Sequence, residues 1–193
     1  MTTHPYSIGM KAKAIYLLLI VGLLSSCKKE TQTVDIEKRY TIEVPVSLTK
    51  TNNLNEEASL QYQDTFNDFF LIVIDEPKAA FIKALEQNSL GSTYKNNLEG
   101  YSKFITDGMD PSISIKKLPD FEETTINGLK ARLLSFEGIA AGNKVYWKLA
   151  FIEGSTTYYQ VMVWTHADNR KKSEKKMVAI IDSFKETDKS KTR

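Results

Sequence analysis

The stretch that decides the fold runs from residue 125 to residue 164 and reads TINGLKARLLSFEGIAAGNKVYWKLAFIEGSTTYYQVMVW. Runs of alternating apolar and polar residues are separated in it by short segments that contain glycine. Asn127-Gly128 is the dipeptide most typical of a two-residue hairpin turn, and glycine returns within 138–143 and 153–155. The pattern predicts consecutive antiparallel strands, at 121–126, 130–137, 145–151 and 158–164.

Upstream of this meander, Phe69 to Ile74 is an uninterrupted apolar run. Its length suits a strand better than a helix, and the lack of alternation indicates a central strand buried on both faces. Shorter strands are predicted at 40–46, 59–63 and 112–116.

Three helices are predicted around these strands. The first follows Pro77, because proline is tolerated in the first helical turn. The second spans about 92–106 and carries an apolar face at helical spacing, made of Tyr94, Leu98, Tyr101 and Ile105. The third spans about 169–185, with a stripe of Met177, Ile180, Ile181 and Phe184. A central antiparallel sheet flanked by helices is an α+β fold, here an α/β/α sandwich.

The N-terminal residues carry the pattern of a secretory signal peptide. Lys11 and Lys13 precede an uncharged, mostly apolar run at 14–24, and two serines follow it. This run is shorter than the roughly 20 residues that cross a bilayer as a helix, so a permanent membrane helix is the weaker alternative. A start of translation at Met10 would give a more compact signal than a start at Met1.

Leu24-Ser25-Ser26-Cys27 closes this segment and resembles the lipobox of bacterial lipoproteins. In those proteins the cysteine is acylated and the signal is cut just before it. Cys27 is the only cysteine of the chain, so it cannot form an internal disulfide. The resemblance implies a protein held at a membrane by two or more acyl chains, which give stable anchoring. Because Lys28 is not the aspartate that signals inner-membrane retention in well-studied diderm bacteria, the outer membrane is expected.

The chain is therefore predicted to have four segments: a signal peptide at 1–26, the lipidated Cys27 with a flexible polar tether at 27–38, an α+β domain at 39–187, and a polar C-terminal tail at 188–193. Removal of the signal takes two lysines from the 26 basic residues and leaves 24 against 24 acidic ones, a net charge of zero. A neutral domain lacks the electrostatic footprint of a nucleic-acid binder.

Four short segments of the predicted domain are distinctive in sequence and in their order along the chain. They are Tyr40-Thr41-Ile42-Glu43-Val44-Pro45, Thr125 to Ala131, Tyr158-Tyr159-Gln160, and Ile181-Asp182-Ser183-Phe184-Lys185. With the order of elements they resemble the PsbP-like family of extracytoplasmic proteins, which includes bacterial lipoproteins of the DcrB type. The resemblance covers roughly residues 39–186 and implies a central antiparallel sheet between helical layers. Members include a photosystem accessory subunit and a nuclear-transport factor that binds a small GTPase, so it implies a binding module and not an enzyme. No motif carries over their contact residues.

Few residues qualify for a catalytic or metal site. His166 is the one histidine after the signal, and without a second cysteine no Cys/His zinc site can be built. Asp107-Gly108-Met109-Asp110 comes nearest to a cation loop but is more typical of a helix-ending turn. A Ser–His–Asp triad would need His166 with Asp168, yet no Gly-x-Ser-x-Gly elbow surrounds any serine. We expect no catalytic, metal or cofactor-binding site.

Aromatic residues of the last two predicted strands provide a candidate binding patch. Core packing accounts for most of them. If the covering helices leave one end of the sheet open, Tyr158, Trp164 and His166 are expected to line a pocket or a protein-binding patch. Downstream, Arg170-Lys171-Lys172 with Lys175-Lys176 forms a basic cluster, which is either a solvated helix face or a contact for anionic lipid headgroups.

These observations predict a lipid-anchored envelope protein with its domain outside the cytoplasm. Its predicted function is to bind a protein partner or to help an assembly, without catalysis. A small-molecule or lipid carrier is the alternative hypothesis. A hydrolase that uses His166 is a third.

Overall fold

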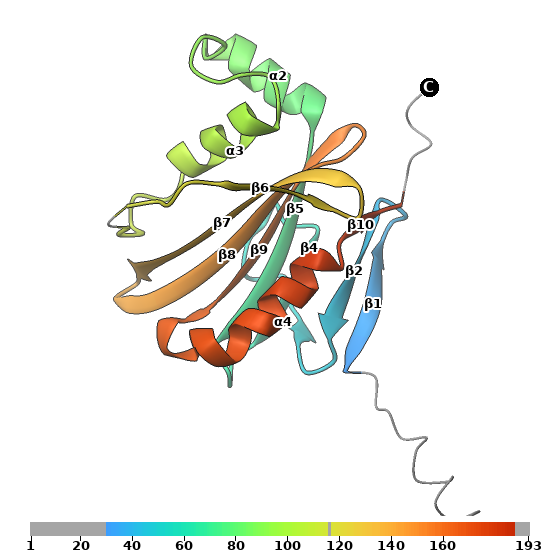
Figure 1. Ribbon diagram of the computed structural model, residues 1–193, viewed down its shortest axis with the longest axis vertical. Coiled ribbons are helices and arrows are strands. Elements are labelled where there is room, and N and C mark those ends of the chain that lie inside the picture. Colours follow the sequence, from blue (N-terminus) through green and yellow to red (C-terminus); the bar gives the residue numbers. More distant parts are fainter. Residues whose placement is uncertain (1–29, 116, 188–193) are drawn as a thin grey trace, which may run out of the picture. The chain divides into compact units, whose positions relative to one another are not determined.

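The structure is a computed structural model that describes residues 30–115 and 117–187 (Figure 1). The predicted signal peptide, Cys27 and the predicted tail at 188–193 lie outside the described residues. A seven-stranded antiparallel sheet has the order β3-β4-β5-β9-β8-β7-β6. Its strands are β3 (Thr49–Lys50), β4 (Leu60–Asp64), β5 (Phe69–Pro77), β9 (Thr157–His166), β8 (Asn143–Glu153), β7 (Leu129–Ala140) and β6 (Glu122–Ile126).

A smaller sheet of three strands, in the order β1-β2-β10, lies beside the large one. Its members are β1 (Thr31–Ile36), β2 (Tyr40–Pro45) and β10 (Lys185–Glu186). The described helices are α2 (Lys78–Gln87), α3 (Leu98–Asp107) and α4 (Arg170–Asp182), the last preceded by the short 3-10 helix η2 (Ala167–Asn169). No helix among the described residues has the length and apolar character needed to span a bilayer.

The predicted meander is confirmed, since β6, β7, β8 and β9 pair consecutively and antiparallel. Asn127 and Gly128 have φ values of 49° and 84°, as the predicted hairpin turn requires. The turn expected over 138–143 is shorter, because β7 continues to Ala140 and only Ala141 and Gly142 make it. Gly138 belongs to the strand, and a Cβ there would come within 2.9 Å of the Ser114 carbonyl oxygen.

Helices cover both faces of the large sheet, so the predicted α/β/α arrangement is confirmed. In Figure 1, α2 and α3 lie above the sheet and α4 lies below it. The cluster under α2 and α3 contains Phe81, Leu85, Leu98, Tyr101, Leu134, Phe136, Trp147, Leu149, Phe151 and Tyr158. The cluster on the α4 side joins Met177, Ile180, Ile181 and Phe184 to β2 and to the opposite side chains of the sheet.

The predicted flexible tether is wrong for Thr31–Ile36, which is strand β1 and pairs with all of β2. Its sequence is polar because it is an edge strand. Only Val34 and Ile36 pack against the core. Thr31 and Thr33 instead donate hydrogen bonds to the Glu43 carboxylate at 2.9 and 2.5 Å. The domain therefore begins several residues closer to Cys27 than the sequence predicted.

Two helix boundaries also differ from prediction. Helix α3 starts at Leu98 instead of residue 92, because the Asn97 side chain caps it by accepting a hydrogen bond from the Gly100 amide at 2.9 Å. Helix α4 ends at Asp182, and the chain continues as β10. The buried Glu186 carboxylate holds β10 by accepting hydrogen bonds from Ser155 and from the Tyr159 hydroxyl.

The strand predicted at 112–116 is reduced to one bridge between Ser114 and Ile139. Strand β6 pairs with β7 only from Leu129 to Leu133. The edge of β7 beyond Leu133 is therefore not paired with β6, and Ser114 forms its bridge to Ile139 in this part of the strand.

Candidate functional site

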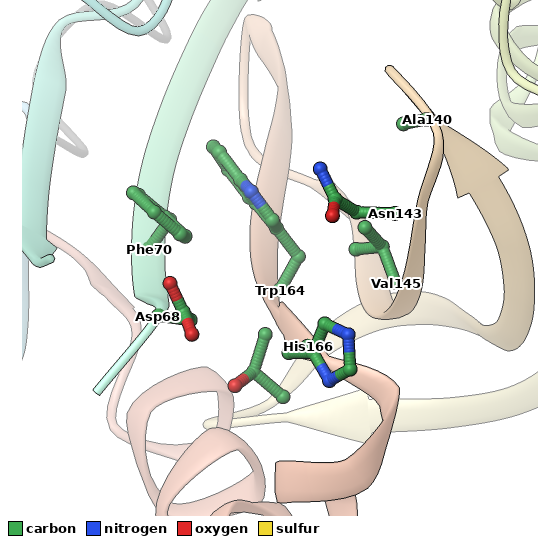
Figure 2. Close-up of a pocket in the computed structure, with 8 residues that line it drawn as sticks. Asp68, Phe70, Ala140, Asn143, Val145, Trp164 and His166 are labelled. Atoms are coloured by element: carbon green, nitrogen blue, oxygen red, sulfur yellow. The ribbon is translucent and has the colours of Figure 1, made fainter. Parts of the chain in front are cut away.

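A pocket of about 360 Å³ opens at one end of the large sheet, where β5 begins and β9 ends. Figure 2 shows the side chains that surround it. We call it the aromatic pocket, and its lining residues are Asp68, Phe70, Ala140, Asn143, Val145, Trp164, Thr165 and His166. They come from the β4–β5 turn, the start of β5, the β7–β8 hairpin and the end of β9.

The pocket exists because the helices cover only part of their sheet face. Helix α2 starts directly after Pro77, at the far end of β5 from Phe69. The eight steps between these residues span roughly 27 Å of strand. Phe81 and Tyr101, from α2 and α3, pack against Tyr158 at that far end. The end that holds Phe70 consequently has no helix over it among the described residues.

Two stacked aromatic rings form the apolar wall of the pocket. Phe70 and Trp164 stand opposite each other in the β5–β9 register. Their ring centroids are 5.3 Å apart and the planes differ by 14°. In Figure 2, Trp164 lies between Phe70 on one side and Asn143 with Val145 on the other. Both rings are only partly buried, so a ligand would find a ready apolar surface.

His166 supplies a polar group at the mouth of the pocket. Its Nδ1 accepts a hydrogen bond from the Asp168 backbone amide at 3.3 Å, and the Asp168 carboxylate lies 3.6 Å from the same nitrogen. When Nδ1 accepts this hydrogen bond, Nε2 is the ring nitrogen that carries a proton and can donate. With the Asn143 amide and the Asp68 carboxylate, the pocket combines an apolar wall with a few polar groups, the composition of a binding site.

Thr165 is the one lining residue with no exposed surface. Its Oγ1 has no hydrogen-bond partner among the described residues. A buried hydroxyl without a partner costs about 1–3 kcal/mol. Thr165 is opposite Phe69 and Tyr146 in the strand register, and both belong to the cluster on the α4 side. Strand alternation therefore places this hydroxyl on the α4 face, opposite the rings of Phe70 and Trp164.

The structure brings together two of the three residues predicted for a binding patch. Trp164 and His166 line the aromatic pocket, whereas Tyr158 does not. Tyr158 is 2% exposed and stacks on Tyr101 at a centroid distance of 4.3 Å. Burial raises the pKa of its phenol. Strand alternation places it on the same sheet face as Trp164, but under the helices. A binding role for these residues stays a prediction.

Sequence reasoning missed the partners of Trp164 and His166. Asp68, Phe70, Asn143 and Val145 precede Trp164 by 19 residues or more in the chain, as the numbering of the two sets shows. Phe70 was assigned to a strand covered on both faces, which holds for its neighbours Leu71 and Ile72 but not for Phe70 itself. The sequence carried no signal for the pairing of β5 with β9.

The basic cluster of α4 is partly neutralised within the domain. Arg170 forms ion pairs with Glu137 at 3.1 Å and Glu174 at 3.6 Å. Its guanidinium lies 4.4 Å from the centre of the Tyr146 ring. The lysines that follow are largely exposed.

The acidic segment 107–110 is a helix-ending turn, as the sequence predicted. Asp107 accepts hydrogen bonds from the Tyr94 hydroxyl and the Lys103 ammonium, and Asp110 accepts one from the Ser112 amide. Within residues 30–115 and 117–187, no three His, Cys, Asp or Glu side chains gather in a way that would hold a metal ion.

The fold is similar to those of two solved structures, one of which is a PsbP. The solution structure of cyanobacterial PsbP from Synechocystis sp. PCC 6803 matches 86% of this chain and 99% of its own length, with a TM-score of 0.55 and 14% identity. A crystal structure from Bacteroides thetaiotaomicron matches 84% of this chain and 50% of its own, with a TM-score of 0.52 and 7% identity. At these identities the likeness shows the fold alone, which is PsbP-like. No family model and no curated protein matches the sequence.

A third solved structure is more distant. LpqN of Mycobacterium tuberculosis, described as involved in cell envelope biogenesis, matches 77% of this chain and 83% of its own, with a TM-score of 0.45 and 13% identity.

Proposed function

We propose that this protein is a lipid-anchored module outside the cytoplasm that binds a protein partner through the aromatic pocket. The anchor is lipid on Cys27, which the signal pattern and the lipobox resemblance support. We do not propose nucleic acid as the partner, because the net charge after signal removal is zero.

The partly exposed stack of Phe70 on Trp164 carries the binding proposal. Large aromatic side chains in a concave, partly desolvated site are the residues that dominate protein interfaces. The open end of the pocket suits an apolar or aromatic side chain from an extended segment of a partner. Asn143, His166 and Asp68 would then hydrogen-bond to its backbone or polar groups.

A catalytic role for His166 has less support. A nucleophile activated by a histidine lies within hydrogen-bond reach of the ring. The polar contacts of His166 within the described residues both go to Asp168, its neighbour in the chain. The ring is therefore held by local structure, and we propose no catalysis.

A small-molecule or lipid carrier is the second candidate. The pocket volume of about 360 Å³ lies within the range of small-ligand sites, about 300–1,000 Å³. Native mass spectrometry of protein purified in mild detergent separates the two proposals. A bound small molecule that is lost in Trp164→Ala would support the carrier.

Lipid attachment is tested by labelling cells with radioactive palmitate and by the variant Cys27→Ser. We expect label on the wild-type chain, and an unprocessed, unlabelled variant. A variant that is still processed and membrane-associated would refute the anchor.

Partner binding is tested with a photo-crosslinking amino acid at Asn143, an exposed position on the pocket rim. We expect one discrete adduct in intact cells and its loss in Trp164→Ala. Val178→Ala is the matched control, because Val178 is apolar and 37% exposed but lies on α4, on the other face of the sheet. A crosslinker at Asn143 that yields no discrete adduct, or an adduct that persists in Trp164→Ala, would contradict protein binding at this site.

A further inference from the structure

We infer that one end of the domain rests on the membrane surface, with Phe66 and Val46 in the lipid interface and Lys171, Lys172 and Lys175 against anionic headgroups. We call this surface the anchor end. The inference rests on the proposed lipid at Cys27 and adds an orientation. The domain contacts the membrane surface through one end and does not move freely at the end of a flexible linker.

The length of chain between the lipid and the fold sets the first constraint. Strand β1 starts at Thr31, four residues after Cys27. Four residues reach at most about 14 Å, whatever their conformation. The start of β1 must therefore stay within that reach of the acylated cysteine. Pro45, at the end of β2, pairs with Thr31 and lies only about 5 Å further away.

Two exposed apolar side chains lie at this same end. Phe66, in the β4–β5 turn, is 93% exposed, and Val46, directly after β2, is 57% exposed. Thr49 pairs with Gln63 in antiparallel register, so the chain before Thr49 and the chain after Gln63 extend in the same direction. Figure 1 shows the start of β1, the end of β2 and the start of α4 at the lower end of the domain.

The turn that carries Phe66 is held in place by its own hydrogen bonds. The Asp64 carboxylate accepts bonds from the Asn67 amide at 3.0 Å and from the Asn67 side chain at 2.8 Å. Asp68 completes the turn with a φ of 48°. A well-defined turn thus presents a large apolar ring to the exterior, which is the arrangement expected of a side chain that enters a lipid interface.

Helix α4 brings positive charge to the same place. The Asn169 side chain donates a hydrogen bond to the Asn67 carbonyl oxygen at 3.2 Å, which fixes the start of α4 beside the turn. Lys171, Lys172 and Lys175 are exposed. The ion pairs found in the described part of the chain do not include them.

Two of these lysines, Lys171 and Lys172, lie in the first turn of α4, a position that is unfavourable within the domain alone. The first turn of α4 contains no acidic residue, and the positive end of the helix dipole disfavours cations there. Asp68 and Asp168 are exposed at this end, but neither is an ion-pair partner of the three lysines. An anionic lipid surface would attract the lysines and offset the repulsion, which is why we favour a membrane over an uncharged partner.

The test uses the full mature chain, acylated in cells, in vesicles of phosphatidylethanolamine and anionic phosphatidylglycerol. Acylation leaves Cys27 without a free thiol, so a cysteine introduced elsewhere is the only labelling site. Phe66→Cys and, at the opposite end of the sheet, Thr156→Cys each receive an environment-sensitive fluorophore. Both residues are exposed, so neither substitution disturbs the core.

We expect brominated lipids to quench the label at residue 66 and to leave the label at residue 156 as in buffer. Reversing Lys171, Lys172 and Lys175 to glutamate should reduce the quenching at residue 66. The same reversal at the exposed lysines 83, 130 and 185, away from the anchor end, should not. Equal quenching at residues 66 and 156, with a mass spectrum that shows acylated Cys27, would overturn the docking and leave the anchor standing. Unmodified Cys27 would overturn both.

Discussion

Replacing Thr165 with valine should stabilise this protein, although most substitutions of buried residues destabilise. Valine has nearly the shape of threonine and the same preference for strands. Thr165 is fully buried and its Oγ1 has no partner among the described residues. Removing an unsatisfied hydroxyl recovers about 1–2 kcal/mol of its desolvation cost. For a chain of this size the melting temperature should rise by about 2–8 °C.

The matched control is Thr106→Val, because Thr106 is buried too but its hydroxyl is satisfied. Its Oγ1 donates to the carbonyl oxygens of Ser102 at 2.9 Å and Lys103 at 3.1 Å. Losing this bonding should lower the free energy of unfolding by about 0.5–1.5 kcal/mol. Both variants are compared with the wild type by urea denaturation, followed by far-ultraviolet circular dichroism because Trp164 fluorescence reports on the pocket itself.

The sign of the change in the free energy of unfolding caused by Thr165→Val shows whether the hydroxyl is unsatisfied. If Thr165→Val lowers the free energy of unfolding as Thr106→Val does, the hydroxyl has a hydrogen-bond partner in solution. The account of Thr165 as a buried, unsatisfied hydroxyl would then be wrong.

Three further predictions concern the core and its pH dependence. Phe184→Ala, at a fully buried ring, should cost about 3–5 kcal/mol and lower the melting temperature by at least about 6 °C; calorimetry that shows a smaller shift would contradict the packing of the α4 side. Burial raises the pKa of Glu76 above its usual range, although the Tyr101 hydroxyl bond opposes this. The folded state therefore binds this proton more tightly than the unfolded state, and stability falls as pH rises through the unfolded pKa toward the folded one. Glu76→Gln removes that loss, so the melting temperature of the variant minus that of the wild type should increase from pH 4 to pH 7. A difference that decreases with pH would refute the raised pKa of Glu76. Gly138→Ala places a Cβ 2.9 Å from the Ser114 carbonyl oxygen and should cost about 1–3 kcal/mol, which urea denaturation would measure.

The regular part of the fold was predictable because its signals are local. Alternation and hairpin dipeptides gave the strands from β6 to β9, and the stripe of Met177, Ile180 and Ile181 gave α4. Strand β1 was not predictable, since Thr31 and Thr33 are polar. Their role in the strand is to hydrogen-bond to Glu43 in the next strand, which a local pattern does not reveal. A polar edge strand and a polar tether have the same composition, and only the pairing with β2 distinguishes them.

The candidate site was predictable only in part, for a similar reason. Trp164 and His166 could be named because they end an aromatic strand. Tyr158 carried the same signal, yet it lies under α2 and α3 and stacks on Tyr101. Which stretch of a sheet face a helix covers depends on the length and direction of the loops that lead to it, and no residue of β9 encodes that.

The sequence by itself determined the α+β class and the order of β4, β5, β6 to β9 and the three helices, because each follows from spacing or composition within a short window. Lipid attachment at Cys27 stays a prediction from the same kind of local pattern. Only the tertiary structure decided that β5 pairs with β9, that Phe70 therefore meets Trp164 at an end of the sheet that the helices leave open, and that Phe66 stands exposed beside the start of α4. Such contacts join residues far apart in the chain, and they form through packing and register, which local patterns do not specify.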